Sequence, residues 1–244
     1  MQHPPKRIAL VSGANKGIGL EIARGLGQAG LMVLVGARDA ALGAAAATAL
    51  RDANLDARCL ELDLTRPVTI QAAAATIRAE FQRLDVLVNN AAIIDPGDGP
   101  PGAVEVDSVR RAMETNFLGT LAVTRAMLPL LREAPAGRIV NVSSGLGSLT
   151  LNADPEWEFA PYKLLGYCAS KAALNMLTVQ LAFELRETPI KVNSADPGYT
   201  ATDLNGNTGT QTAAEAASEP VRLALLPADG PTGGFFRAGG IHPW

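Results

Sequence analysis

The sequence predicts an α/β fold, in which a doubly wound parallel sheet carries helices on both faces. Two observations predict it. Short apolar segments, suited to buried parallel strands, alternate with longer segments rich in Ala, Leu, Glu and Arg, the residues common in helices. A glycine-rich turn follows the first apolar segment and leads directly into the first helical one. Such βαβ units have right-handed crossovers, and their ligands bind beyond the carboxyl ends of the strands.

The predicted elements follow one another in regular alternation. The strand candidates are the apolar runs IALVSG (8–13), LMVLVGA (31–37), ARCLELD (57–63), DVLVNNA (85–91), RIVNVSS (138–144) and IKVNSADPG (190–198). The helix candidates are Gly17–Ala29, Ala40–Ala53, Pro67–Phe81, Val106–Glu133 and Cys168–Glu187. A short strand at Gly234–Arg237 is expected to finish the sheet.

Length and composition favour one domain over residues 1–244. A chain of 244 residues with 48% apolar composition is long enough to bury a sizeable core. The densest stretch of proline and glycine, Ile93–Pro101, separates two strongly patterned segments without a shift in composition, so it is interpreted as a loop. No internal repeat interrupts the pattern.

The charge pattern argues for small-molecule partners. The net charge is −3 and no basic cluster occurs, which argues against nucleic acid and against an anionic membrane surface. The start of the chain lacks an apolar stretch behind a basic region, and the run Ala40–Leu50 is too short to span a bilayer. We therefore expect a soluble, cytoplasmic protein.

Cysteine and histidine are scarce, which bears on redox and metal chemistry. Cys59 is expected on an interior strand and Cys168 at the start of the helix Cys168–Glu187, so a disulfide is not expected. A reducing compartment fits this expectation. His3 and His242 lie at the two ends of the chain, outside every patterned segment. Metal ligation and histidine-based catalytic triads are therefore not expected, and no metal is predicted.

The glycine-rich turn is expected to bind a dinucleotide phosphate. Its glycines allow a tight turn, close approach of the backbone to a pyrophosphate and close packing of the helix, whose first N–H groups face the anion. A plain glycine turn is the alternative, and the position between the first strand and the first helix favours the binding role. The loop runs through Gly13, Asn15, Lys16, Gly17, Ile18 and Gly19.

The residues after the second strand favour NADP(H) over NAD. An NAD enzyme usually has an acidic residue there to accept from the ribose hydroxyl, and Ala37 cannot do so. Arg38 and Lys16 instead supply two cations where a 2′-phosphate would lie. Asp39 follows at once and could weaken this argument, although in that position it more often caps a helix.

Tyr167 and Lys171, in YCASK, are the candidates for proton transfer. A lysine four residues after a tyrosine lies on the same helix face. Its ammonium is expected to stabilise the phenolate and to lower the pKa of the tyrosine, making the phenol a usable proton donor. The alternative is an ordinary helix surface that happens to carry both residues.

The chain resembles the short-chain dehydrogenase/reductase family over nearly its whole length. The motifs are GANKGIG (13–19), Asp63-Leu64, NNAA (89–92), TNFLGT (115–120), NVSS (141–144), YCASK (167–171) and DPGYTAT (196–202). NKGIG, TNFLGT, the segment PVRLALLP and the terminal tryptophan make the carbonyl-reductase branch the most similar one. The resemblance implies a Rossmann-type fold.

The resemblance also implies the catalytic roles. Tyr167 would donate a proton to the carbonyl oxygen, and Ser144 would hydrogen-bond that oxygen, with Ser143 as the neighbouring alternative. Lys171 would support Tyr167 and hold the nicotinamide ribose, and Asn116 would keep a water that passes protons to Lys171. For Asn116 the alternative is a solvent-facing polar residue.

Further residues would bind the cofactor by the same resemblance. Asp63 would meet the adenine amino group with Leu64 beside it, and Asn90 would form a wall of the adenosine ribose site. The segment after the sixth strand would grip the nicotinamide carboxamide, although Thr202 could equally cap a helix. Its residues are Pro197, Gly198, Thr200 and Thr202.

The chain departs from the family pattern in two places. Ala92 stands where glycine is frequent, and Ser144 and Tyr167 lie further apart in sequence than in most members. The extra residues, 149–166, include Trp157 and Phe159, which either wall the substrate pocket or cover the surface. Similar insertions cover a dimerisation face in the carbonyl-reductase branch, so a monomer is favoured.

We therefore expect an enzyme that reduces a small-molecule ketone or aldehyde with NADPH. The alternatives are an alcohol, hydroxysteroid or sugar dehydrogenase working in the oxidative direction, and a catalytically silent NADP-binding sensor. Ser144, Tyr167 and Lys171 together argue against the sensor. The segment after Thr202, rich in Gly, Thr and Asn, is expected to act as a mobile lid.

Overall fold

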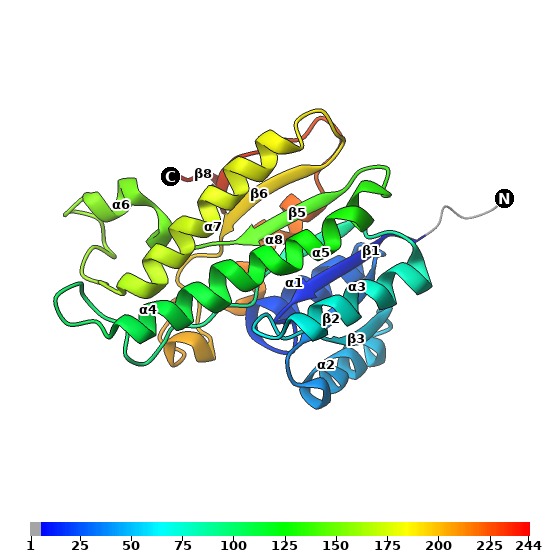
Figure 1. Ribbon diagram of the computed structural model, residues 1–244, viewed down its shortest axis with the longest axis horizontal. Coiled ribbons are helices and arrows are strands. Elements are labelled where there is room, and N and C mark those ends of the chain that lie inside the picture. Colours follow the sequence, from blue (N-terminus) through cyan, green and yellow to red (C-terminus); the bar gives the residue numbers. More distant parts are fainter. Residues whose placement is uncertain (1–5) are drawn as a thin grey trace.

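A computed structural model describes residues 6–244, so His3 lies outside the described residues. These residues form one sheet with the strand order β3-β2-β1-β4-β5-β6-β7-β8 (Figure 1). The pairs from β3 to β7 are parallel, and β8 runs antiparallel to β7. The predicted doubly wound sheet is confirmed. Among residues 6–244, no helix is long and apolar enough to cross a bilayer.

The observed strands match the predicted ones closely. They are β1 (Ile8–Ser12), β2 (Met32–Ala37), β3 (Ala57–Glu61), β4 (Val86–Asn89), β5 (Arg138–Val142), β6 (Lys191–Asp196), β7 (Phe235–Arg237) and β8 (Gly240–Ile241). The helices are α1 (Gly17–Gln28), α2 (Ala40–Asp52), α3 (Pro67–Phe81), α4 (Val106–Met113), α5 (Thr120–Arg132), α6 (Leu149–Ala153), α7 (Leu165–Glu184) and α8 (Ala213–Ala224). Three short helical turns are η1 (Glu114–Gly119), η2 (Gly145–Gly147) and η3 (Asp203–Asn205).

Alternation along the strands divides the apolar core between the two faces of the sheet. Ala9 and Val11 of β1 pack on one face with residues of α1, α2 and α8. Ile8 and Leu10 pack on the other face with residues of α3, α5 and α7. Successive side chains of a strand point to opposite faces, so a strand buried on both sides is apolar nearly throughout, as are β2 and, up to Ser12, β1.

Several element predictions are wrong in detail. The strand that carries Cys59 is an edge strand, because β3 ends the strand order, and both cysteines are free. The catalytic helix begins at Leu165 rather than Cys168 and ends at Glu184 rather than Glu187. The single helix expected over Val106–Glu133 widens into a π-helical turn, η1, between α4 and α5.

The helices α6 and α8 and the strand β8 are not predicted from the sequence. Helix α8 begins with a capping box, in which Thr212 Oγ1 accepts from Glu215 N at 3.2 Å and Glu215 Oε2 accepts from Thr212 N at 2.8 Å. That spacing is a sequence signal for a helix start. Strand β8 has only two residues and pairs with β7 as the last part of the sheet.

The chain order of the strands reverses direction beside β1. From β1 the chain continues to β2 and β3 on one side, and then returns to β4 on the other side of β1. The loops that follow β1 and β4 therefore diverge and leave a crevice at the carboxyl ends of these strands, which is where open α/β sheets bind ligands.

A ladder of buried polar side chains holds the strands and helices below this crevice. Asn89 Nδ2 of β4 donates to Thr124 Oγ1 (3.0 Å) and to Asn141 Oδ1 of β5 (2.8 Å). Asn141 Nδ2 donates to Thr178 Oγ1 of α7 (2.8 Å), which in turn bonds Ser194 Oγ of β6 (2.8 Å). Within this network only Asn89 Oδ1 has no hydrogen-bond partner among residues 6–244. Buried networks of this kind help to fix a unique packing arrangement.

Candidate active site

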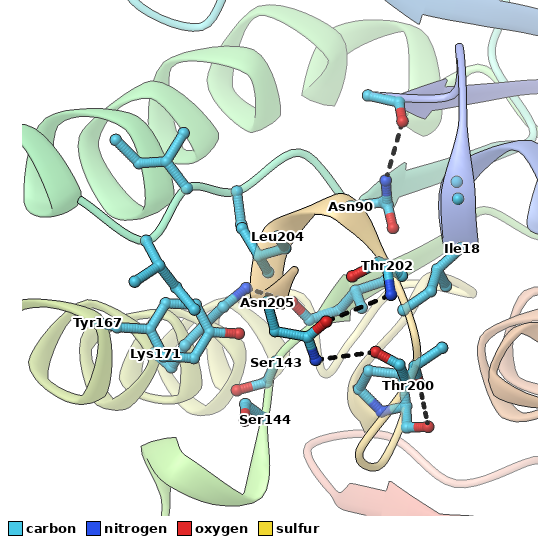
Figure 2. Close-up of a pocket in the computed structure, with 18 of the residues that line it drawn as sticks. Ile18, Asn90, Ser143, Ser144, Tyr167, Lys171, Thr200, Thr202, Leu204 and Asn205 are labelled. Carbon is cyan, nitrogen blue, oxygen red and sulfur yellow. Dashed lines mark hydrogen bonds between the residues drawn. The ribbon is translucent and has the colours of Figure 1, made fainter. Parts of the chain in front are cut away.

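A cleft of about 1370 Å³ lies at the carboxyl ends of the strands (Figure 2). It is lined by the glycine-rich loop, the ends of β2, β4 and β5, the start of α7, the segment after β6 and the insertion 149–166. Pockets for a single small ligand commonly measure about 300–1,000 Å³, so the cleft has room for a dinucleotide together with a second molecule.

Tyr167, Lys171 and Ser144 all line the cleft. Tyr167 and Lys171 lie one turn apart near the start of α7, and both side chains are buried. Lys171 Nζ donates to the main-chain oxygen of Val142 at 2.8 Å and lies 5.6 Å from the centre of the Tyr167 ring. The Ser144 side chain lies close enough to the Tyr167 hydroxyl to lower the pKa of the phenol. The structure thus brings the predicted trio together.

The pKa of Tyr167 shifts in the direction opposite to the one expected from the sequence. Burial raises the pKa of the phenol, and the neighbouring Ser144 side chain only partly opposes this. Burial also lowers the pKa of Lys171 to about 8, with the carboxylate of Asp196 acting in the opposite direction. The expected lowering of the tyrosine pKa is wrong, because desolvation by burial is the largest influence and raises the pKa, and Tyr167 is a protonated donor at neutral pH.

The geometry distinguishes the two neighbouring serines. Ser144 is half-buried at the cleft, and its Oγ also accepts from Leu146 N at 3.2 Å. Ser143 is buried, and its Oγ has no hydrogen-bond partner among residues 6–244. Ser144 is therefore the serine that contacts the phenol, as the family pattern favours.

Asn116 is buried in η1, so the solvent-facing alternative is wrong. Its Oδ1 accepts from Ile93 N at 2.8 Å, and its Nδ2 donates to Ile93 O at 2.9 Å and to Ser170 Oγ at 3.0 Å. Single π-helical turns occur frequently at functional sites. The amide ties the loop after β4 to α7, whereas its role in holding a water stays a prediction.

The glycine-rich loop fits an anion at the start of α1. Gly13 has φ +64°, and a Cβ there would lie 2.9 Å from Ala91 Cα. A Cβ on Gly19 would lie 2.4 Å from both Asn90 Nδ2 and Gly13 O. No side chain caps α1 and no acidic residue occupies its first turn, so its first N–H groups are left for a ligand. Asn15, Lys16, Gly17 and Ile18 also line the cleft.

The cationic end of the cleft carries Arg38 and Lys16. Both side chains line the cleft, and Lys16 Nζ contacts Asp203 Oδ2 at 2.6 Å in an exposed ion pair. Asp39 caps α2, because its Oδ1 accepts from Ala41 N and Leu42 N. The capping role of Asp39 is confirmed, and its carboxylate is engaged at the helix start.

The predicted adenosine residues line the cleft as well, although Asn90 has a further structural contact. Asp63 Oδ1 accepts from both N and Oγ1 of Thr65, and Leu64 is buried beside it. Asn90 Nδ2 donates to Ser12 O (2.9 Å) and Gly13 O (3.2 Å), so its amide holds the glycine-rich loop. Sequence reasoning missed Ser12, whose Oγ accepts from Asn90 N and Ala91 N.

The segment after β6 turns sharply into the cleft. Gly198 has φ +75°, a backbone conformation that favours glycine. Thr200 is buried, and its Oγ1 donates to Gly198 O at 3.1 Å. Thr202 is the N-cap of η3, and its N–H donates to Asn205 Oδ1 at 3.3 Å. Pro197, Gly198, Thr200 and Thr202 all line the cleft, as predicted.

Aromatic side chains wall the other end of the cleft. Trp157 and Phe159 of the insertion lie 5.5 Å apart between ring centres, and Phe159 lies 5.6 Å from Tyr199 and 6.0 Å from Tyr162. All four rings line the cleft. Of the two interpretations of the insertion, the structure therefore favours the pocket wall.

The insertion does not cover the exposed apolar face of α7. It packs near the start of this helix (Figure 1) and leaves Met176 (57% exposed), Val179 (37%) and Phe183 (66%) accessible. The insertion therefore leaves these three side chains uncovered. The monomer stays a prediction.

Sequence reasoning missed Asp98, which holds the start of α7. Asp98 Oδ1 accepts from Gly166 N and Oδ2 accepts from Tyr167 N, each at 2.8 Å. The residue at the N-cap position, Leu164, makes no side-chain cap hydrogen bond. Asp98 thus caps the catalytic helix from the loop after β4, and its negative charge suits a helix N-terminus. Its distance in sequence from α7 gives no local signal.

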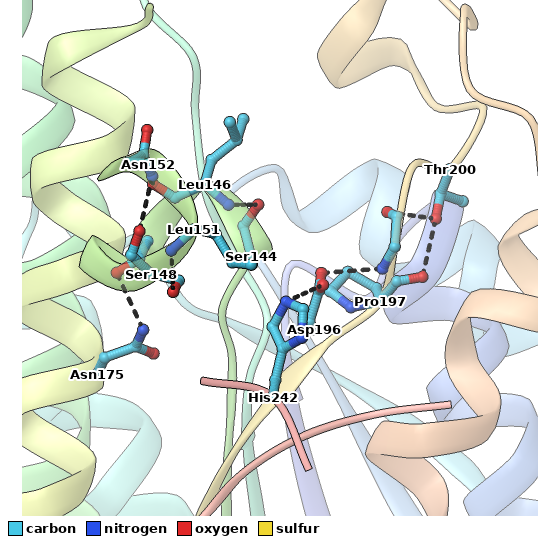
Figure 3. Close-up of polar contacts among 12 residues, drawn as sticks. Ser144, Leu146, Ser148, Leu151, Asn152, Asn175, Asp196, Pro197, Thr200 and His242 are labelled. Atoms are coloured by element: carbon cyan, nitrogen blue, oxygen red, sulfur yellow. Dashed lines mark hydrogen bonds and ion pairs between the residues drawn. The ribbon is translucent and has the colours of Figure 1, made fainter. Parts of the chain in front are cut away.

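The structure also adds His242 to the cleft. Its side chain is 6% exposed and lines the cleft, although the residue lies near the chain end (Figure 3). Its Nε2 lies 3.1 Å from Asp196 Oδ2. His242 lies outside every segment that the sequence pattern predicts, yet the structure brings it to the cleft, because the end of the chain returns to the sheet through β7 and β8.

The comparisons with known proteins agree with this geometry. A family model described as short chain dehydrogenase matches residues 7–213. A carbonyl reductase 1 (NADPH) of Sus scrofa is 36% identical over 98% of this chain and 94% of its own length. A (+)-neomenthol dehydrogenase of Capsicum annuum is 32% identical over 94% and 95%, respectively.

Solved structures show the same similarity. The salutaridine reductase of Papaver somniferum superposes with a TM-score of 0.82 at 30% identity, covering 95% of this chain and 99% of that one. An NADPH-bound carbonyl reductase from chicken fatty liver superposes with a TM-score of 0.84 at 27% identity, covering 98% and 99%.

Asp98→Ala should destabilise the protein by about 2 kcal/mol, because two N–H groups at the start of α7 lose a charged acceptor. Urea denaturation followed by circular dichroism measures this change. Asp107→Ala is the matched control, since Asp107 is an exposed aspartate in the first turn of α4 that forms an exposed ion pair with Arg110. Equal stability of the Asp98 variant and the control would contradict the capping role.

Proposed function

Because the chain belongs to the short chain dehydrogenase family, we propose that it reduces a ketone or aldehyde to an alcohol with NADPH. The observation that carries the proposal is the meeting of Tyr167, Ser144 and Lys171 in a cleft whose other end has cations and an uncapped helix start. Relatives named as carbonyl reductases using NADPH support the direction and the cofactor.

Residues of this chain fit the parts of NADP(H). The uncapped start of α1 and the close-packed glycines suit the pyrophosphate, and Arg38 with Lys16 suits the 2′-phosphate. Asp63, Leu64 and Asn90 are assigned to the adenosine end, and the segment Pro197–Thr202 to the nicotinamide end. When bound, the reduced nicotinamide supplies the hydride of the reduction.

Tyr167 is assigned as the proton donor to the carbonyl oxygen. Reduction at the carbonyl carbon leaves negative charge on that oxygen, and a preplaced O–H donor stabilises the charge as it develops. Tyr167 keeps its proton until then, because burial raises its pKa, and an alkoxide is a much stronger base than a phenolate. Transfer of the proton from the phenol oxygen to the alkoxide oxygen completes the alcohol.

Ser144 and Lys171 support this transfer in different ways. The Ser144 hydroxyl lies beside the phenol and, with a substrate bound, can donate its one proton to the carbonyl oxygen, which orients the substrate. The Lys171 ammonium, held by Val142 O, stabilises the phenolate that remains after the transfer. Lys171, together with a water at Asn116, is proposed to return a proton from solvent.

The aromatic wall suggests the class of substrate. Trp157, Phe159, Tyr162 and Tyr199 offer a broad apolar surface beside Tyr167, and their contacts favour rings and bulky hydrocarbon groups. We propose a bulky alicyclic or aryl ketone rather than a small polar one. Relatives named neomenthol dehydrogenase and salutaridine reductase support this choice.

NADPH consumption with a panel of aryl and alicyclic ketones tests the function, with Tyr167→Phe as the deciding variant. The variant should lose at least about 10²-fold in kcat, since it lacks the proton donor, while its dissociation constant for NADPH changes little. The rate at which NADPH absorbance is lost measures kcat, and NADPH fluorescence measures the dissociation constant. Undiminished turnover by the Tyr167→Phe variant would contradict the role of Tyr167 as proton donor. A wild type that binds NADPH but shows no turnover would favour the alternative of a catalytically silent NADP-binding sensor.

The rate should fall above about pH 8. Lys171 is cationic below its pKa of about 8 and neutral above it, so the ammonium that stabilises the phenolate is present at low pH and lost as the pH rises. A profile of kcat/KM from pH 6 to 10 measures this. In Asp196→Asn the descending limb should move to lower pH, because the carboxylate raises the pKa of Lys171. A limb that stays in place in this variant would contradict the assignment.

The wild type should use NADPH better than NADH. The substitution Arg38→Ala should impair the use of NADPH but not that of NADH. The loss of one charge-assisted phosphate contact should raise KM for NADPH about tenfold and leave KM for NADH unchanged. Arg66→Ala is the control, because Arg66 is an exposed arginine near β3 that pairs with Glu61 outside the cleft. Equal Michaelis constants for the two cofactors in the wild type would refute the preference.

A further inference from the structure

The last residues of the chain fold back onto the candidate active site. After β8, His242 N donates to Phe235 O of β7 at 2.8 Å. The imidazole packs edge-on against the Phe235 ring (4.8 Å between ring centres), and Trp244 stacks on the same ring (5.3 Å). Trp244 O accepts from Thr150 N of the insertion at 3.0 Å. The chain end thus joins the sheet to the insertion.

The imidazole of His242 makes one polar side-chain contact that matters for the cleft. Its buried Nε2 lies 3.1 Å from Asp196 Oδ2 but makes no hydrogen bond with residues 6–244 as the ring stands. A proton on Nε2 and a small rotation of the imidazole would turn this contact into a hydrogen bond to the carboxylate. The other carboxylate oxygen, Oδ1, accepts from Gly198 N at 3.0 Å. Asp196 therefore has one oxygen on the chain end and one on the turn after β6 (Figure 3).

This pair lies against the residues that carry the proposed chemistry. A Cβ on Gly145, the residue after Ser144, would lie 3.1 Å from His242 Nε2, 3.2 Å from Asp196 Oδ2 and 3.2 Å from Trp157 Cζ2. The pair thus packs directly behind the serine and beside the aromatic wall. The charge of Asp196 also acts on Tyr167 and Lys171, raising the pKa of both. Arg237 of β7 lines the same part of the cleft.

We propose that His242 is a positioning residue of the active site, which holds the Asp196 carboxylate and thereby fixes the turn Pro197–Gly198 and the negative charge beside Tyr167 and Lys171. The inference rests on the proposed function, since the turn is assigned there to the nicotinamide end. Without the donor on Nε2, the carboxylate is free to turn toward solvent and releases Gly198. The chain end is then a part of the site, although it is remote from it in sequence.

Two substitutions separate the hydrogen bond from the packing. His242→Phe keeps an aromatic ring against Phe235 and Trp244 but removes the donor. His242→Gln removes the ring and retains an amide N–H at the position of Nε2. Ile241→Ala is the control on the same segment, because Ile241 is 80% exposed. NADPH fluorescence gives the dissociation constant, ketone reduction gives kcat and KM, and thermal unfolding gives stability.

The donor role predicts that His242→Phe binds NADPH about tenfold more weakly and loses about tenfold in kcat, as expected for one hydrogen bond to a charged group. KM for the ketone and the unfolding midpoint should change little. His242→Gln and the control should stay within about twofold of the wild type in NADPH binding. Full function of His242→Phe, or equal losses in the Phe and Gln variants, would overturn the proposal.

A second pair of measurements keeps the inference testable if His242→Phe does not fold. Asp196→Asn retains an acceptor for Gly198 N but removes the charge that His242 holds. It should weaken NADPH binding, and adding His242→Gln should weaken it no further, because the two residues act as a unit. Unchanged binding in Asp196→Asn, or additive losses, would contradict the pairing. A wild type that binds NADPH without turnover would reject the proposed function but not this inference, because NADPH binding can still be compared among the variants.

Discussion

The candidate site depends on one interaction, the hydrogen bond between the buried ammonium of Lys171 and the main-chain oxygen of Val142. Removing an ammonium from water is costly, and a single carbonyl oxygen repays only part of that cost. The lowered pKa of Lys171 records the imbalance. The bond nevertheless sets the distance between α7 and the end of β5, and so places Tyr167 beside Ser144. The same burial that opposes the charge on the lysine keeps the proton on the tyrosine.

Other contacts hold α7 in this position from several directions. Asp98 binds the N–H groups at its start, and Asn116 bonds Ser170 from η1. Farther along, Thr178 joins the buried ladder to β5 and β6. These are short, mostly buried hydrogen bonds from residues far apart in sequence, and each removes one way in which the helix could slide or rotate. A proton donor that must meet a carbonyl oxygen within a few tenths of an ångström needs such restraint.

The alternating apolar segments predict the sheet well because burial on both faces leaves a strong signal in strands such as β1 and β2. The motif residues around Tyr167 are predicted for a similar reason, since chemistry restricts their types. The edge position of Cys59 is not predictable from its own segment, because strand order is a property of the whole chain. The roles of Asp98 and His242 are not predictable for the same reason, since each residue contacts partners that are remote in sequence. The pKa of Tyr167 depends on burial that spacing along a helix cannot reveal.

The two ends of the cleft differ in how firmly their charges are engaged, and this difference matters for the proposed cofactor. At the catalytic end, buried groups hold one another in place, with His242 on Asp196 and Lys171 on Val142. At the other end, the pair between Lys16 and Asp203 is exposed on both sides. Exposed ion pairs contribute little to stability, so exchanging Asp203 for a phosphate costs Lys16 little. The pair also joins the glycine-rich loop to the segment after β6, so a phosphate that engaged Lys16 in place of Asp203 would remove this link between the two segments.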